Sequence, residues 1–324
     1  MERFARELSA RLPALRPGRY AVVRPPSALA HRAGHAWEQA LLPLKGRRAE
    51  LIYCPANLAP LVSRRNVVVL HDVAALRHPE WYSPAYVRYQ RLLLPALARR
   101  ARLVITVSEF ARREVGSALG VPEQRLAVVP DGVDDRFSPN ADPSPARTAH
   151  GLDRPYVLAV GTLIARKNLG ALATAERRLA AEGIELVTAG SGRGYMRSGD
   201  RPPGRQLGYV RDDHLPGLYA GALALAMPSL YEGFGLPCLE AMASGVPVVA
   251  ANRAALPETC GDAALLVDPE DHEGLADALL AAVTDAALRA RLAAAGTERA
   301  AQFGWDRTAR LTDEAIDGLL RGSG

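Results

Sequence analysis

The chain has 324 residues, of which 48% are hydrophobic and 23% charged, and its mean hydropathy is -0.04. These values are typical of a soluble globular protein of two α/β domains and argue against disorder. No apolar run reaches the roughly 18 residues that cross a bilayer, and three scattered cysteines indicate neither a disulfide framework nor a zinc site.

Charge is unevenly distributed along the chain, whose formal net charge is +5. Residues 1–150 carry 23 Lys and Arg against 13 Asp and Glu, whereas residues 151–324 carry 17 against 22. A basic first half predicts an anionic partner. Nucleic acid is not favoured, because no basic cluster is interleaved with aromatic residues and no nucleic-acid module is recognisable. An anionic phospholipid surface is the better prediction.

The first half begins with a charged, amphipathic stretch at residues 1–8, which predicts a helix and does not resemble a signal peptide. Together with reduced cysteines, this predicts a cytoplasmic location, with peripheral binding to the inner face of the membrane as an addition. Short apolar, β-branched runs follow between helical stretches. They predict strands at 20–23, 51–53, 67–70, 103–107 and 126–129.

A polar, Pro-rich stretch at residues 139–145 reads as a linker. Beyond it the alternation of apolar strands and helices resumes, and such continuous apolar strands are typical of parallel sheets covered on both faces. We therefore predict two Rossmann-like domains, 1–145 and 154–304, joined near 138–154. The predicted strands of the second half are 156–160, 184–188, 206–210, 222–226, 246–250 and 264–267.

The stretch at residues 88–102 joins an apolar stripe to five arginines. A helix lying on a membrane surface has this character, with arginine heads near anionic lipid. A surface helix packed on its own sheet has it equally, and Pro95 interrupts the periodicity. Both interpretations remain open from the sequence.

Two glutamates, Glu232 and Glu240, stand eight positions apart in the segment 231–245. The first lies on a Gly-rich turn and the second about two turns into the helix that this turn opens. The helix N-terminus between them offers unpaired N–H groups and the positive end of its dipole to an anion. Phosphate binding by backbone and hydroxyl binding by two carboxylates predict a site for a nucleotide sugar.

Several motifs accompany this segment in order along the chain. In the second half they lie at 160–168, 207–210, 218–222, 231–245 and 246–250, and in the first half at 69–72, 107–110 and 129–134. With these motifs the chain resembles the family 4 glycosyltransferases, which are retaining enzymes. The resemblance implies the GT-B fold, in which two Rossmann-like, doubly wound parallel-sheet domains face a central cleft. It also implies that a C-terminal helix, about 305–324, packs back on the first domain.

The resemblance also implies roles for individual residues. Glu240 would bind the ribose hydroxyls of the donor, Glu232 the hydroxyls of the transferred sugar, and Arg166 and Lys167 the diphosphate. His71, at the end of a first-domain strand, would line the cleft near the donor sugar, with Asp72 capping the next helix or touching the acceptor. The remaining donor-binding positions are Gly161, Tyr209, Val210, Gly233, Phe234, Gly235 and Leu236.

The sequence departs from the family pattern in two places. Thr162 stands where many relatives have an arginine, which puts one phosphate contact in doubt. Relatives usually begin with a strand and a Gly-rich loop before the helix that residues 1–8 resemble, so we expect the first domain to lack that strand and loop. Three explanations stay open: a start assigned too late, a trimmed chain, or another segment that takes the place of the strand and loop. A real loss would bear on both the stability of the first domain and catalysis.

The predicted reaction is transfer of a hexose or deoxyhexose from a nucleoside-diphosphate sugar to a hydroxyl of a glycan, lipid-linked or small-molecule acceptor. The family implies a front-face mechanism without metal or other cofactor, and no Asp-x-Asp pair is placed to hold a divalent ion. Residues 71–72, together with 37–39, resemble the branch of the family that builds polysaccharides. This resemblance favours GDP-mannose as the donor. Two alternatives stay open: a non-catalytic or truncated nucleotide-sugar-binding protein, and a GT-B sugar-nucleotide epimerase.

Overall fold

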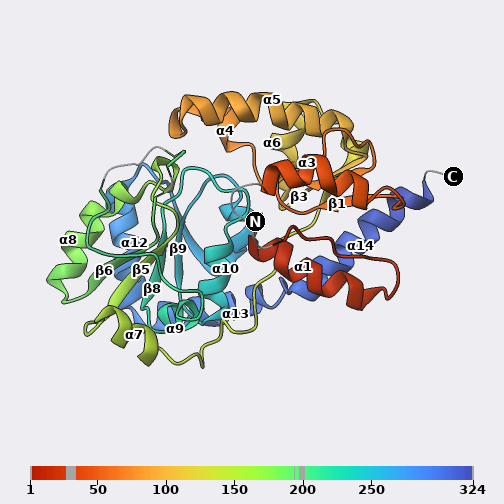
Figure 1. The fold of residues 1–324 in the computed structure, drawn as a ribbon. Helices are drawn as coiled ribbons and strands as arrows, with labels where there is room; N and C mark the ends of the chain where they lie inside the picture. Colours follow the sequence, from red (N-terminus) through yellow and green to blue (C-terminus); the bar gives the residue numbers. More distant parts are fainter. Residues whose placement is uncertain (1, 27–33, 193, 197–200, 323–324) are drawn as a thin grey trace. The chain divides into compact units, whose positions relative to one another are not determined.

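A computed structural model describes residues 2–26, 34–192, 194–196 and 201–322. The chain divides into two compact units. Unit 1 comprises Met1–Arg77, Ala85–Gly132 and Trp305–Gly324, and unit 2 comprises His78–Pro84 and Val133–Gly304. Figure 1 shows the elements of each unit in colours that follow the sequence.

Unit 1 is built on a parallel sheet with the strand order β1-β2-β3-β4. All residues of β2 and β3 are buried, as expected for the centre of a sheet covered on both faces. The strands are β1 (Ile52–Cys54), β2 (Asn66–Val69), β3 (Leu103–Thr106) and β4 (Leu126–Val128). The helices are α1 (Glu2–Leu15), α3 (Gly34–Lys45), α4 (Ala74–Arg77), α5 (Pro84–Arg100), α6 (Glu109–Leu119) and α14 (Trp305–Arg321).

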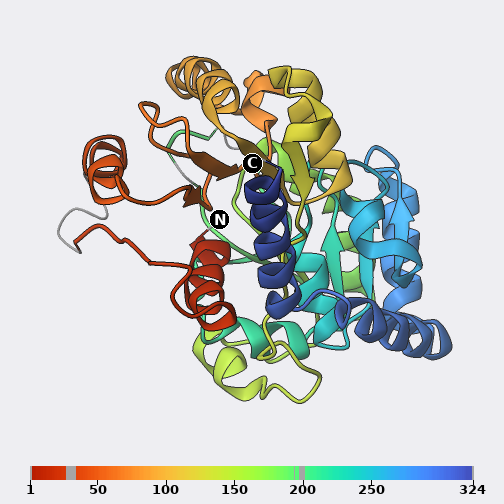
Figure 2. The same ribbon diagram turned by 90° about the vertical axis from the view of Figure 1, so that its right-hand side faces the viewer.

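The two terminal helices of unit 1 lie side by side, and both views show red α1 along blue α14 (Figures 1 and 2). Phe4, Leu8 and Leu12 recur every four residues along α1 and are buried. Ion pairs join the polar edges of the two helices, including Arg11 with Asp306 at 2.8 Å. The predicted helix at the start of the chain is thus confirmed from Glu2 onward, and Met1 lies outside the described residues.

The strand predicted at residues 20–23 is wrong. The segment forms no ladder with another described strand, and Val22 and Val23 are 46% and 38% exposed. Apolar composition alone does not make a strand, because the backbone N–H and C=O groups also need partners in a sheet. The other four strands predicted in the first half are confirmed within one or two residues.

Unit 2 holds a six-stranded parallel sheet with the order β10-β9-β8-β5-β6-β7. Helices α8 and α12 pack on each other and bury apolar side chains against β5, β8 and β9. The strands are β5 (Tyr156–Val160), β6 (Glu185–Ala189), β7 (Arg205–Gly208), β8 (Ala224–Met227), β9 (Val248–Ala251) and β10 (Ala264–Val267). The helices are α7 (Ser144–His150), α8 (Ala173–Ala181), α9 (Leu215–Ala220), α10 (Leu236–Ala243), α11 (Leu256–Cys260), α12 (His272–Thr284) and α13 (Ala286–Ala300).

All six strands predicted in the second half are confirmed, two of them with the predicted ends and four with ends that shift by one or two residues. The stretch 139–145, predicted as a linker, lies inside unit 2, where α7 begins at Ser144. The chain passes from unit 1 to unit 2 between Gly132 and Val133. Two parallel sheets of this kind confirm the predicted pair of Rossmann-like folds.

Candidate donor-binding site

The loop between β8 and α10 carries the first of the paired glutamates. It ends at Gly235, whose φ of 107° lies in the left-handed region that favours glycine, and α10 starts at the next residue. Thr259 donates a hydrogen bond to the carbonyl of Phe234 at 2.5 Å, which fixes the end of the loop from α11. Glu240 is the fifth residue of α10, so the expectation of about two turns placed it one turn too far along the helix.

An ion cluster forms at the carboxyl end of the sheet in unit 2. Arg166 and Lys167, on the turn after β5, both contact the same oxygen, Oε1 of Glu232, with Arg166 Nη1 at 2.9 Å and Lys167 Nζ at 2.8 Å. Lys167 and Glu232 are only 6% and 7% exposed. Such a buried cluster of two cations and one carboxylate carries a net positive charge, which suits a site that receives an anion.

The protonation states of the cluster follow from burial and from the neighbouring charges. Burial alone raises the pKa of the Glu232 carboxyl, but Arg166 and Lys167 outweigh that effect and hold the pKa at about 2. Burial lowers the pKa of Lys167, against the opposing attraction of Glu232. Glu232 is therefore ionised at neutral pH and paired directly with the cations, an arrangement that the sequence did not indicate.

Gly161 lies against the ion cluster at the end of β5. A Cβ added at this position would come within 2.6 Å of Cε of Lys167, so only glycine leaves room for the buried lysine. Arg166 also donates to the carbonyl of Tyr231 at 2.7 Å, which ties the turn after β5 to the loop before α10. The predicted donor-binding residues Gly161, Arg166, Lys167 and Glu232 are thus brought together in one place.

Glu240 is held by a tyrosine that the sequence analysis did not assign. Tyr219 on α9 donates a hydrogen bond to Oε2 of Glu240 at 2.7 Å, and both side chains are buried. The edge of Tyr219 meets the ring of Phe137, with 5.5 Å between centroids. Tyr219 fixes the plane of the Glu240 carboxylate, and each carboxylate oxygen has two lone pairs, so Oε2 can accept a ligand hydroxyl in addition. The motif 218–222 was the available signal.

Replacing Tyr219 with phenylalanine tests this arrangement. We expect ribonucleoside diphosphate binding to weaken about tenfold, because a hydrogen bond to a charged group contributes roughly 1.5–3 kcal/mol and only its orienting part is lost. Titration calorimetry with ribo- and 2′,3′-dideoxyribonucleotides should show that the preference for ribose shrinks. Tyr156→Phe is the control, since it removes another buried tyrosine hydrogen bond, to the Leu218 carbonyl at 2.7 Å, without touching Glu240. Equal losses in the two variants would contradict the assignment.

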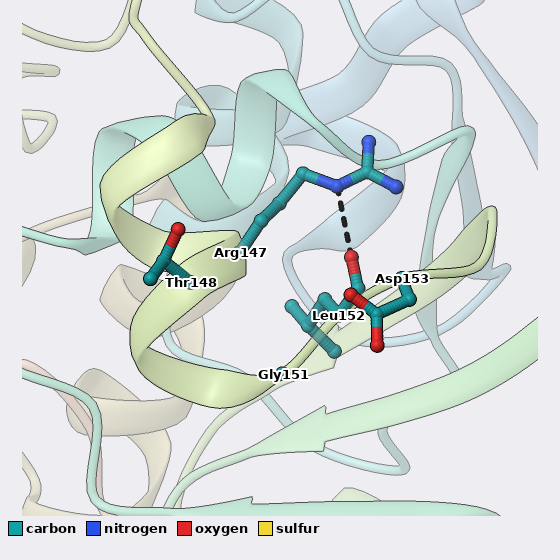
Figure 3. A pocket seen from close by; sticks show the side chains of 5 residues that line it. All are labelled: Arg147, Thr148, Gly151, Leu152 and Asp153. Atoms are coloured by element: carbon teal, nitrogen blue, oxygen red, sulfur yellow. Dashed lines mark hydrogen bonds between the residues drawn. The ribbon is translucent and has the colours of Figure 1, made fainter.

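The other predicted positions of unit 2 lie on the loops after β7 and β8. Tyr209 follows β7 with a side chain that is 75% exposed, whereas Val210 is buried. Gly233, Phe234, Gly235 and Leu236 form the approach to α10 and its first residue. A separate pocket beside α7 has a volume of about 450 Å³. It is lined by Arg147, Thr148, Gly151, Leu152 and Asp153 (Figure 3). None of the predicted site residues lines it.

His71 lies in unit 1, two residues after the end of β2, and is 8% exposed. Burial lowers the pKa of its imidazole to about 3, so the ring is neutral at physiological pH. Nε2 lies 3.1 Å from the carbonyl oxygen of Pro55. A carbonyl can only accept, so Nε2 carries the proton and Nδ1 is left as the acceptor. The neighbouring Asp72 caps α4 by accepting from the N–H of Ala74 at 3.0 Å, one of the two roles predicted for it.

A buried carboxyl near the carboxyl end of the same sheet was missed. Asp131 follows β4, is 9% exposed, and has no hydrogen-bond partner for Oδ1 among the described residues. Burial raises the pKa of its carboxyl to about 6. The motif at 129–134 contained this residue, but nothing in the sequence showed that it is buried.

The raised pKa of Asp131 predicts a specific pH dependence of stability. The folded state retains the proton up to about pH 6 and the unfolded chain only to about 3.8, so the free energy of unfolding falls by at most about 3 kcal/mol as pH rises through this window. We expect Asp131→Asn to abolish that fall, as measured by urea unfolding at pH 4.5 and 7.5. Asp313→Asn should instead destabilise at both pH values, because it breaks the ion pair with Arg16 at 3.0 Å. An unchanged pH slope in Asp131→Asn would contradict the prediction.

Three further findings concern cofactors and the membrane. Within residues 2–26, 34–192, 194–196 and 201–322, no group of three or more His, Cys, Asp or Glu side chains could hold a metal ion. All three cysteines are free and buried. No described helix is both long and apolar enough to cross a membrane.

Comparison with known proteins decides the family. Residues 3–137 match the profile described as Glycosyltransferase Family 4, and residues 154–285 match that of Glycosyl transferases group 1. The chain is 33% identical over 312 residues to the O-antigen chain mannosyltransferase B of Escherichia coli, which covers 89% of this chain and 78% of the relative. The chain belongs to glycosyltransferase family 4. The family 4 enzyme described here is thus a glycosyltransferase, as the ordered set of motifs predicted.

Other relatives can be aligned over most of the length of the transferase. It is 32% identical over 282 residues to the GDP-mannose-dependent alpha-(1-6)-phosphatidylinositol monomannoside mannosyltransferase of Mycobacterium tuberculosis, covering 80% of the chain and 73% of that relative. It spans only 35% of the serotype-specific mannosyltransferase WbdA of Escherichia coli, at 28% identity. The structure of Anabaena HepE with UDP-glucose has a TM-score of 0.70 at 24% identity, covering 86% of the transferase and 81% of HepE. This likeness supports the GT-B fold.

Proposed function

We propose that the transferase moves a mannosyl group from GDP-mannose to a hydroxyl of a glycan or lipid-linked acceptor, with retention at the anomeric carbon and without a metal. The buried cluster of Arg166, Lys167 and Glu232 beside the N-terminus of α10 carries this proposal. Relatives named as mannosyltransferases, one of them GDP-mannose-dependent, support the choice of sugar and base.

In this proposal each site residue binds a different part of the donor. Glu240, oriented by Tyr219, accepts hydrogen bonds from the ribose hydroxyls. Arg166, Lys167 and the N–H groups at the start of α10 bind the diphosphate and stabilise the negative charge that grows on it as the sugar departs. Glu232 binds hydroxyls of the transferred sugar, and the diphosphate then replaces it as the partner of the cations. His71 takes part as a neutral hydrogen-bonding group, since its imidazole stays unprotonated.

Titration of the purified chain with GDP, UDP and dTDP, with and without EDTA, tests the donor site. We expect micromolar binding of GDP, insensitive to EDTA, followed by turnover of GDP-mannose with a sugar acceptor and retention detected by proton NMR. Binding of UDP or dTDP alone would reject guanosine as the base. Binding without any turnover would favour a non-catalytic protein, and altered donor sugar without transfer would favour an epimerase.

We further propose an anionic membrane surface as a partner of unit 1. The inner face of α5 is buried, as for a helix packed on its sheet, but Arg88, Arg91 and Leu92 on its outer face are exposed. Leu92 and Val62 are each 72% exposed, and Arg100 of α5 donates to the carbonyl of Leu61 at 2.7 Å, next to Val62. Sedimentation with phosphatidylcholine vesicles, with and without phosphatidylglycerol, tests this. Salt-sensitive binding to the anionic vesicles is expected, and equal recovery with both compositions would reject it.

A further inference from the structure

The chain makes an excursion from unit 1 into unit 2 that no motif indicated. It leaves unit 1 after Arg77, contributes His78–Pro84 to unit 2, and returns to unit 1 at Ala85. The excursion contains the short 3₁₀ helix Pro79–Trp81. We call residues 78–84 the crossing segment.

The crossing segment packs aromatic rings against the loop that carries Glu232. The imidazole of His78 stacks on the indole of Trp81, with 4.0 Å between centroids and an angle of 17°. Both rings meet the ring of Tyr231 edge-on, at 5.5 Å and 6.4 Å. Trp81 and Tyr231 are 9% and 4% exposed, so the contact is a packed one.

Tyr231 connects this packing to the ion cluster. Its carbonyl accepts the hydrogen bond from Arg166 Nη1, the same nitrogen that lies 2.9 Å from Oε1 of Glu232. Glu232 is the next residue in the chain. A shift of the Tyr231 ring therefore displaces the backbone that orients both Arg166 and Glu232.

The other end of the crossing segment joins the loop after β6. The N–H of Ser83 donates to the carbonyl of Tyr195 at 3.0 Å, and Tyr82 forms an antiparallel bridge with Met196. The start of that loop is bonded to the turn that carries the cations, because the N–H of Leu163 donates to the carbonyl of Ser191 at 3.2 Å. The crossing segment thus contacts both loops that neighbour Arg166 and Lys167.

We propose that the crossing segment is a positioning element of the donor site, which places Arg166 and Glu232 for the diphosphate and sugar end of the donor. This inference rests on the proposed function of the site. A loop that served only to bury Trp81 would need one apolar surface. This segment instead packs against the loop of Tyr231, whose carbonyl binds Arg166, and hydrogen-bonds to a second loop after β6. The nucleoside end is assigned to Glu240, which Tyr219 holds, and its binding should depend much less on the crossing segment.

Trp81→Leu tests the proposal through the two ends of the donor. We expect the affinity for GDP-mannose to fall about tenfold or more, since small misplacements in a preorganised site have effects of this size, whereas the affinity for GMP changes less than about twofold. Displacement calorimetry measures both ligands. The KM for GDP-mannose should rise with an unchanged acceptor KM, and Trp81→Phe should restore most of the loss.

Trp37→Leu is the matched control, because it removes a buried tryptophan (6% exposed) from α3 of unit 1. It should lower thermal stability without changing the ratio of the GDP-mannose and GMP affinities. If Trp81→Leu weakens both ligands equally, or leaves both unchanged while the wild type binds them, the crossing segment does not position the donor. If the wild type binds no guanosine, uridine or thymidine nucleotide, the proposed function itself fails first.

Discussion

Replacing Glu240 with alanine is expected to weaken nucleoside-diphosphate binding about 100-fold or more, with a protein that stays folded. The carboxylate is buried on α10 and held by Tyr219, so in the proposed complex it would meet the two ribose hydroxyls without reorganising. Two hydrogen bonds to a charged acceptor, each contributing roughly 1.5–3 kcal/mol, account for a loss of this size. Titration calorimetry with the preferred diphosphate measures it directly.

Two further variants separate binding from folding. Glu240→Gln keeps an oxygen acceptor for Tyr219 and should lose less affinity than Glu240→Ala, because a neutral amide accepts hydrogen bonds more weakly. Glu273→Ala removes a glutamate at an exposed position of α12, where the side chain is 74% exposed, and should change neither binding nor stability. Unaltered affinity in a folded Glu240→Ala protein would show that the nucleotide does not bind at this site.

Local sequence patterns predicted the fold of this transferase well. The strand Val248–Ala251 is apolar throughout and follows a turn that contains Gly245 and Pro247, so its type could be predicted from a few residues. The local structure around the paired glutamates was equally predictable, because a glycine turn followed by a helix start restricts the backbone to few conformations. Such features depend on neighbours in the sequence.

The features that were missed depend on partners far along the chain. Tyr219 and Glu240 are 21 positions apart, and nothing near either residue shows that the two side chains meet. Trp81 lies 150 positions before Tyr231, and its segment looks like an ordinary turn between helices. The error at residues 20–23 has the same origin, since a strand needs a partner whose position the segment does not reveal.

The pairing of Glu232 with both cations also escaped the sequence analysis, which assigned the cations to phosphate and the carboxylate to sugar. Both assignments concern the loaded site. Without a ligand, two buried cations would be costly to desolvate, and a nearby carboxylate that pairs with them lowers that cost. Glu232 therefore stabilises the folded protein when no ligand is bound. In our proposal it binds the transferred sugar when the donor is present.

Lys167→Met should separate the effect of the ion cluster on folding from its effect on the reaction. It retains most of the length of the side chain beside Gly161 but removes one of the two cations that, in our proposal, face the departing diphosphate. We expect kcat to fall about 10²- to 10³-fold, comparable to the loss of one preorganised donor at a developing charge, with a smaller rise in the KM for the donor. Lys167→Arg should not restore the rate fully, because the planar guanidinium is larger than the ammonium that it replaces in this buried space beside Gly161.

Lys167→Met should also lower stability, because it leaves Glu232 with one cation fewer, and neutralising Glu232 as well should reverse that loss. The folded pKa of Glu232 is about 2, below its ordinary value of 4.5, so the ionised pair contributes stability above about pH 4.5 that is lost as pH falls toward 2. That contribution is at most about 3 kcal/mol, and it should shrink in Lys167→Met because one of the two cations is gone. In the double variant Lys167→Met with Glu232→Gln, urea unfolding between pH 3 and 7 should show stability largely regained and the acid-side slope reduced, while activity stays lost. Recovery of activity together with stability would show that Lys167 acts on folding alone and not on the departing diphosphate.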